Sequence, residues 1–263
     1  MKIHFACIAM LIAVSASAAS ISDVYVIPAA AHAVGATGEL WQSDVSFFNP
    51  DSTPLTLDLA LVGPSGNSST IGTTLTLAPH ATQLVSDVIG SAGGSGAIIV
   101  SGNHPFVAMS RARASSARGN FAESVFPAAE FFDATSRDSF ITGLASNSAS
   151  RTNVGFFAAA DRGAPMTITI TLLGADGTQL GTPQSFTVPA GGMMQTQISV
   201  RALTSSSFDN ATARVSITGG SGVATAYGSV IANDSGDGAF IAGSSGAMPP
   251  SSAAAALRAH FGW

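Results

Sequence analysis

Residues 54–63 read PLTLDLALVG, and residues 165–174 read PMTITITLLG. In both stretches an apolar side chain occupies every second position between the opening proline and the closing glycine. A hydrophobic period of two is typical of a β-strand with one buried and one solvated face. The same strand therefore occurs twice, which predicts an antiparallel β-sheet protein built from a repeated unit.

The similarity extends outward from these stretches in the same order in both halves of the chain. A glycine follows three residues after each strand, at Gly66 and Gly177. Four further segments correspond: 44–48 with 153–157, 75–79 with 186–189 (one residue shorter), 98–102 with 215–219, and 106–110 with 223–227. A register kept over about a hundred residues indicates duplication of one structural unit.

Turn sequences rich in Gly, Pro, Ser and Asp separate the apolar runs at short intervals, for example 63–66, 175–177 and 219–222. Many short strands with regular turns predict an all-β chain of two tandem antiparallel β-sandwich domains, immunoglobulin-like or jelly-roll-like. We expect the first domain at 20–133 and the second at 134–245. Residues 246–263 are expected to form a linker and a short C-terminal helix or tail. The segments 96–101 and 106–113 are expected to be separate strands with a turn between them.

The first residues have the layout of a secretory signal peptide. Lys2 is followed by an apolar run at 3–14 and by small residues at 16, 18 and 19. A run of about 12 apolar residues is too short to span a bilayer as a helix. We expect residues 1–19 to be removed and the mature protein to be secreted, periplasmic or on the cell surface, without a membrane-spanning segment.

The composition of the mature chain excludes several functions. The one cysteine, Cys7, and the one lysine, Lys2, both lie in the signal peptide, which leaves nine arginines, fifteen acidic residues and a net charge of −6. Thiol catalysis, disulfides and cysteine-bound metals are therefore excluded. An acidic chain without lysine is also a poor partner for nucleic acid.

No catalytic motif occurs. The sequence has no G-x-S-x-G and no H-E-x-x-H, and His80 and His104 stand beside prolines in expected turns. We therefore predict no catalytic residues and a non-enzymatic protein.

Residues 233–238, NDSGDG, resemble part of a calcium-binding loop, because alternate oxygen-bearing side chains around a glycine can surround a hard cation. Asp234 and Asp237 are the candidate ligands, and calcium is the one cofactor considered. The loop lacks a terminal bidentate carboxylate, and Asn, Asp and Gly are equally the residues of a hairpin turn.

Aromatic residues suggest one ligand site. Trp41 precedes the first strand shared by the two halves and has no counterpart in the second, so it is the candidate for stacking on a sugar. The Phe-Phe pairs at 47–48 and 156–157 occupy matched positions and are expected in the core.

Arg111, Arg113 and Arg118 form the densest basic cluster. Arg111 and Arg113, two residues apart, should lie on one face of a strand and could pair with Glu123 on the next.

Residues 41–50, 53–57 and 77–79 resemble the tandem immunoglobulin-like repeats of uncharacterised secreted bacterial proteins. The resemblance covers residues 22–245, although Ala158 and Ala159 replace the Asn49-Pro50 of the first copy. It implies a fold and an extracytoplasmic location, and it brings no activity. The leading hypothesis is a structural or adhesive protein of the bacterial envelope or exterior, with an unknown protein or glycan partner. The alternative is a carbohydrate-binding module or an accessory part of a secreted polysaccharide-acting system.

Overall fold

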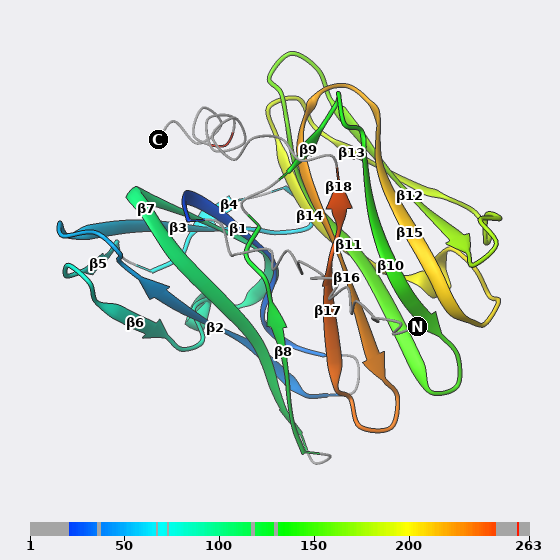
Figure 1. Cartoon of the computed structure of the whole chain (residues 1–263), viewed down its shortest axis with the longest axis horizontal. Coiled ribbons are helices and arrows are strands. Elements are labelled where there is room, and N and C mark those ends of the chain that lie inside the picture. The colour runs from blue at the N-terminus through cyan, green and yellow to red at the C-terminus, as the bar shows by residue number, and fades with distance from the viewer. Residues whose placement is uncertain are drawn as a thin grey trace, which may run out of the picture.

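The computed structural model describes residues 21–35, 38–66, 68–72, 74–116, 119–128, 131–245 and 257. The expected signal peptide, Arg118 and the expected C-terminal helix apart from Leu257 lie outside these residues. Figure 1 shows strands throughout both halves of the molecule. The predicted all-β sandwich fold is confirmed.

The first half contains one curled eight-stranded sheet. Its elements are β1 (Ser22–Val34), β2 (Leu40–Phe48), β3 (Leu55–Val62), β4 (Ser68–Thr70), β5 (Leu75–Leu77), β6 (Thr82–Val85), the short 3₁₀ helix η1 (Gly90–Ala92), β7 (Gly94–Ser116) and β8 (Gly119–Val125).

Strand β7 curls the sheet into two layers. Residues 94–106 of β7 pair with β1, and part of the same segment pairs with β3, whereas residues 107–116 pair with β2 and β8. The expected turn between two strands is wrong, because the pairing with β1 shifts register between Ser22 and Val24 and one continuous strand passes from one layer to the other. The first hydrophobic core fills the space between the layers. It includes Val45, Phe47, Leu57, Ile98 and Phe106.

The second half is a sandwich of two separate sheets. Its elements are β9 (Phe132–Asp133), β10 (Asp138–Ser146), β11 (Ser150–Ala160), β12 (Met166–Gly174), β13 (Gln184–Val188), β14 (Met193–Ser199), η2 (Val200–Ala202), β15 (Phe208–Gly219), β16 (Gly222–Ala232), β17 (Gly238–Ala242) and β18 (Ser244–Ser245). One sheet has the order β13-β12-β15-β10-β18 and the other β14-β11-β16-β17, with β9 added to β16. Phe156, Ile168 and Val215 belong to the core of this half.

The two halves share their strand pairings. The pairs β1–β7, β3–β7, β3–β5, β2–β6, β2–β7 and β7–β8 correspond to β10–β15, β12–β15, β12–β13, β11–β14, β11–β16 and β16–β17. The sequence correspondence between residues 44–48 and 153–157 is therefore matched by equivalent positions in β2 and β11. The domain boundary at 133/134 stays a prediction.

A third apolar cluster joins the two halves. Val26 and Ile99, on the outer face of β1 and β7, belong to one cluster with Phe157, Met193 and Val223 of the second half. Both faces of the first part of β7 are therefore covered, which explains why residues 97–100, AIIV, form an unbroken apolar run instead of an alternating one. Leu257 is also fully buried in this cluster.

The Phe-Phe pairs do not share one environment. Phe47 and Phe156 lie in the two cores and Phe157 lies between the halves, but Phe48 is 36% exposed. The expectation that all four are core residues is wrong for Phe48, because it points to the outer face of β2, which no described element covers. Within the described residues, no helix is both long and apolar enough to cross a membrane.

Candidate functional site

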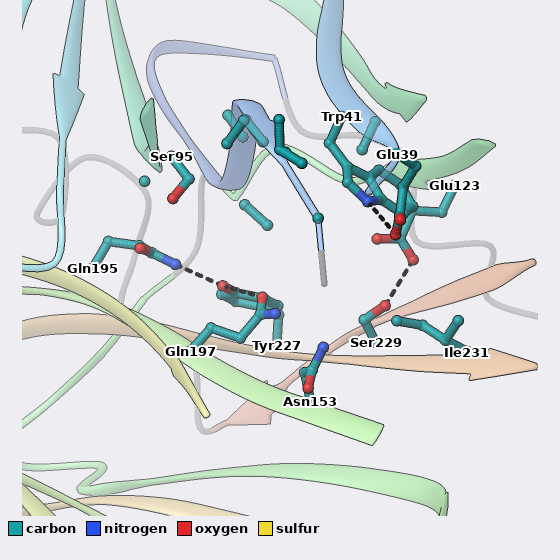
Figure 2. A pocket seen from close by; sticks show the side chains of 18 of the residues that line it. Glu39, Trp41, Ser95, Glu123, Asn153, Gln195, Gln197, Tyr227, Ser229 and Ile231 are labelled. Atoms are coloured by element: carbon teal, nitrogen blue, oxygen red, sulfur yellow. Dashed lines mark hydrogen bonds between the residues drawn. The ribbon is translucent and has the colours of Figure 1, made fainter. Parts of the chain in front are cut away.

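A cavity of about 360 Å³ lies where the two halves meet (Figure 2). Its walls come from β1, β2, β7 and β8 of the first half and from β11, β14 and β16 of the second. On the first side, β1 contributes a run of alanines, and the pairing of β1 with β7 shifts register between Ile27 and Ala30. Small side chains at this irregular point leave the space open.

Trp41 and Glu39 form one end of the cavity. The indole Nε1 of Trp41 donates a hydrogen bond to Oε1 of Glu39 at 3.1 Å, and Glu39 is only 6% exposed. Gly35 completes this corner, because a Cβ atom there would lie 2.6 Å from Oε1 of Glu39 and 2.7 Å from Nε1 of Trp41. The hairpin before β2 therefore requires glycine at position 35 for the Trp41–Glu39 pair to form.

Tyr227 forms the opposite wall. Its hydroxyl accepts a hydrogen bond from Nε2 of Gln195 at 2.7 Å and donates one to Oε1 of Gln197 at 3.1 Å. Burial raises the pKa of the Tyr227 hydroxyl, and the hydrogen bond from Gln195 only partly opposes this effect. The ring stacks on Phe240 with a centroid separation of 5.5 Å. Tyr227 is thus a neutral, fixed anchor that orients two amide side chains of β14.

Glu123 brings a second carboxyl group to the cavity. Its Oε2 accepts a hydrogen bond from Oγ of Ser229 at 2.9 Å, which links β8 of the first half to β16 of the second. Burial raises the pKa of Glu123, and the hydrogen bond from Ser229 opposes this. Arg151 and Asn153 of β11 also line the cavity, so a ligand would meet both charged and amide groups there.

The predicted pairing of the arginines with Glu123 is wrong. Arg111 and Arg113 bind the Oδ2 atom of Asp44 on β2, at 3.1 and 2.9 Å. In the β7–β8 register Glu123 lies opposite Ala112, the residue between the two arginines, so its side chain projects from the other face of the sheet.

Asp234 and Asp237, the candidate calcium ligands, lie in the turn between β16 and β17. The carboxylate of Asp234 accepts a hydrogen bond from the backbone N–H of Ser235, and the backbone carbonyl of Asp237 accepts one from the N–H of Ala232. Gly236 has a φ of +85°, as a tight turn requires. Among the described residues there is no group of three or more His, Cys, Asp and Glu side chains placed to hold a metal ion. Calcium binding at this turn stays a prediction.

Sequence reasoning selected Trp41, and the structure places it in the cavity wall. It did not select Glu39, Gln195, Gln197 or Tyr227. The two glutamines carried a usable signal, since their spacing of two places them on one face of a strand. Nothing in the sequence indicated that β2, β14 and β16 would meet.

Comparison with known proteins gives no assignment. No model of a known protein family matches this sequence, and no curated protein matches it. A solved structure, the PBSX exported protein XepA, is similar to it at 13% identity, over 81% of this chain and 84% of that chain, with a TM-score of 0.26. A TM-score this low does not establish a common fold.

Proposed function

We propose that this protein is a non-enzymatic, extracytoplasmic binding module and that its ligand is a carbohydrate held in the cavity between the two sandwiches. The observation that carries the proposal is the lining of the cavity, in which the indole of Trp41 lies together with Asn153, Gln195 and Gln197. The volume of about 360 Å³ lies at the lower end of the range for small-molecule sites, about 300–1,000 Å³.

This lining has the chemistry that a sugar requires. A pyranose offers an apolar C–H face, which packs on an aromatic ring, and hydroxyl groups that each donate and accept hydrogen bonds. Amide side chains supply both donors and acceptors, and carboxylates supply acceptors. The fixed Tyr227 hydroxyl holds both glutamine side chains in place before any ligand arrives, which reduces the entropy lost on binding.

The same cavity also contains carboxyl groups of the kind that a glycosidase uses. Glu39 and Glu123 are two carboxyl groups lining one cavity, and glycoside hydrolysis uses such a pair. Each of them already accepts a hydrogen bond from the protein, from Trp41 and from Ser229. We therefore assign them to holding the cavity together. Release of reducing ends from a bound polysaccharide, lost in Glu39→Gln and Glu123→Gln, would overturn this assignment.

The location and the ancestry of the protein are also proposals. The layout of residues 1–19 supports export, and the matching strand pairings of the two halves support descent from a duplicated immunoglobulin-like unit. Amino-terminal sequencing of the protein recovered from outside the cytoplasm tests the first point, with a start at residue 19 or 20 as the expected result.

A glycan array followed by fluorescence titration tests carbohydrate binding. The chain has two tryptophans, so Trp263→Phe leaves Trp41 as the single reporter. We expect a saturable change in Trp41 emission with the saccharides that bind on the array, and at least a tenfold weaker affinity in Asn153→Ala. Phe140 is an exposed aromatic residue on β10, so Phe140→Ala is the matched control and should bind the saccharides normally. Absence of binding by the unaltered protein to any arrayed glycan or polysaccharide would reject carbohydrate as the ligand.

A structural or adhesive role through protein contacts is the second candidate. It is favoured by the exposed apolar side chains of Phe48, Leu84 and Met109.

A further inference from the structure

The outer face of β2, β6 and β7 carries an apolar patch. Ser46 of β2 lies directly opposite Leu84 of β6 and Met109 of β7, and Phe48 follows two residues later on the same face. Leu84 is 60% exposed, Met109 41% and Phe48 36%. The patch therefore spans three neighbouring strands, and the positions that join its members are Ser46 and Thr82, which are uncharged.

The equivalent face of the second half of the chain is covered by another part of the protein. Gly155 of β11 lies opposite Gln197 of β14 and Tyr227 of β16, which is the register position of Ser46. Phe157 then corresponds to Phe48. Phe157 is fully buried, because the first sandwich packs against the outer face of β11, β14 and β16.

The first sandwich thus presents the equivalent of a surface that, in the second sandwich, is an interface. Both surfaces contain a phenylalanine at the same register position and large side chains on the two flanking strands. In the first sandwich, Leu84 and Met109 take the places of Gln197 and Tyr227, so the uncovered surface is the more apolar of the two at these positions.

The partner must offer apolar side chains in return. Among the described residues, the outer face of the sheet formed by β10, β12 and β15 offers one large exposed apolar side chain, Phe140, and Arg214 lies directly opposite it. On β12 the same face carries hydroxyl groups, where Thr169 contacts Ser185 and Thr218. A head-to-tail stack of copies would therefore place Leu84 and Met109 against hydroxyl groups, an arginine and a single aromatic ring. A second copy of the same patch provides matching apolar side chains.

We propose that the face centred on Ser46 is the contact surface of a symmetric homodimer, in which Phe48, Leu84 and Met109 of one protomer pack on the same residues of its partner. This proposal is independent of carbohydrate binding, because the cavity lies between the two halves of one chain.

Light scattering over a range of concentrations tests the proposal. The unaltered protein should approach twice the mass of its monomer as its concentration rises. Leu84→Arg should raise the dimer dissociation constant at least tenfold, with an unchanged circular dichroism spectrum. Phe140→Ser removes an exposed aromatic from the second sandwich and should leave the dimer intact. A monomer at every concentration, or loss of the dimer only in Phe140→Ser, would overturn the proposal.

A cysteine cross-link gives an independent readout if Leu84→Arg fails to fold. Cys7 is the one cysteine of the chain, so Ser46→Cys combined with Cys7→Ser places a single thiol at the centre of the patch. We expect a disulfide-linked dimer under mild oxidation, whereas Phe140→Cys in the same background should stay monomeric on a non-reducing gel. Equal cross-linking of the two variants would exclude a defined interface at Ser46.

Discussion

Glu123 of β8 accepts a hydrogen bond from Ser229 of β16, with 2.9 Å between the two oxygen atoms, and this contact joins the first sandwich to the second across the cavity. A carboxyl group at such a junction is partly removed from water, which disfavours its charged form and raises its pKa.

The raised pKa of Glu123 predicts a pH dependence of stability. The folded protein keeps the Glu123 proton at pH values where the unfolded chain, with an ordinary pKa near 4.5, has already lost it. The stability contributed by Glu123 is therefore complete below about pH 4.5 and is lost as the pH rises through the folded pKa. Melting temperatures measured from pH 4 to 8 should fall less steeply with pH in Glu123→Gln than in the unaltered protein.

Ser229→Ala gives the matching control for this pH dependence. The hydrogen bond from Ser229 lowers the pKa of Glu123, so its removal should raise that pKa further and extend the loss of stability to higher pH. Identical pH profiles for Ser229→Ala and the unaltered protein would show that the contact does not act on Glu123.

Asp44 should contribute to stability with the opposite pH dependence, because its pKa is lowered and not raised. It is 5% exposed, and its carboxylate accepts hydrogen bonds from Arg111, Arg113 and the backbone N–H of Asp87. Burial acts to raise the pKa of Asp44, but these hydrogen bonds together hold it below its ordinary value. Its stabilising contribution is therefore present above the unfolded pKa and is lost as the pH falls through the folded one.

Replacing Asp44 tests this network. Asp44→Ala removes the shared acceptor of two arginines and of the backbone N–H of Asp87, and it should cost about 1–3 kcal/mol of unfolding free energy, measured by urea denaturation at pH 7. Arg111→Ala should cost less than about 1 kcal/mol, because the Arg111 side chain is 56% exposed. Similar costs for the two variants would contradict the network.

The fold could be predicted well from the sequence, because the alternation of apolar and polar residues marks each strand locally. Residues 54–63 and 165–174 form β3 and β12 almost at the expected bounds, and the order of strands is the same in both halves. The continuous β7 was not predicted, since the Gly102–Pro105 segment has the composition of a turn. This segment stays within one strand because the residues before it pair with β1 and β3 and the residues after it pair with β2.

The candidate site was harder to predict, because it forms where two sandwiches pack. Trp41 was selected for its chemistry and its absence from the second half. Tyr227 could not be selected, since its position depends on Gly155, a residue of β11 that looks like any other strand glycine in the sequence.

Gly155 therefore gives a test of the cavity wall. A Cβ atom at this position would lie 2.5 Å from the Tyr227 ring and 2.7 Å from the carbonyl oxygen of Thr196. Gly155→Ala should reduce the unfolding free energy by about 1–3 kcal/mol, because Tyr227 must move. Gly163→Ala is the control, since a Cβ atom there meets nothing within 4 Å, and its unfolding free energy should not fall. A stable Gly155→Ala protein with unchanged tyrosine absorbance would contradict the described packing.

Phe48 and Phe157 provide a matched pair for the contact between the sandwiches, because they occupy equivalent positions in β2 and β11. Phe157→Ala removes a fully buried ring from the cluster that joins the halves and should cost about 3–5 kcal/mol. Because the removed ring lies in the interface between the two sandwiches and not in either core, the sandwiches should unfold separately. Calorimetry should then resolve two unfolding transitions where the unaltered protein shows one.

Phe48→Ala removes the same ring from an exposed position, and in dilute solution, where the chain is monomeric, it should cost less than about 1 kcal/mol and keep a single transition. One shared transition in Phe157→Ala would mean that contacts such as Glu123–Ser229 couple the two sandwiches without the apolar cluster.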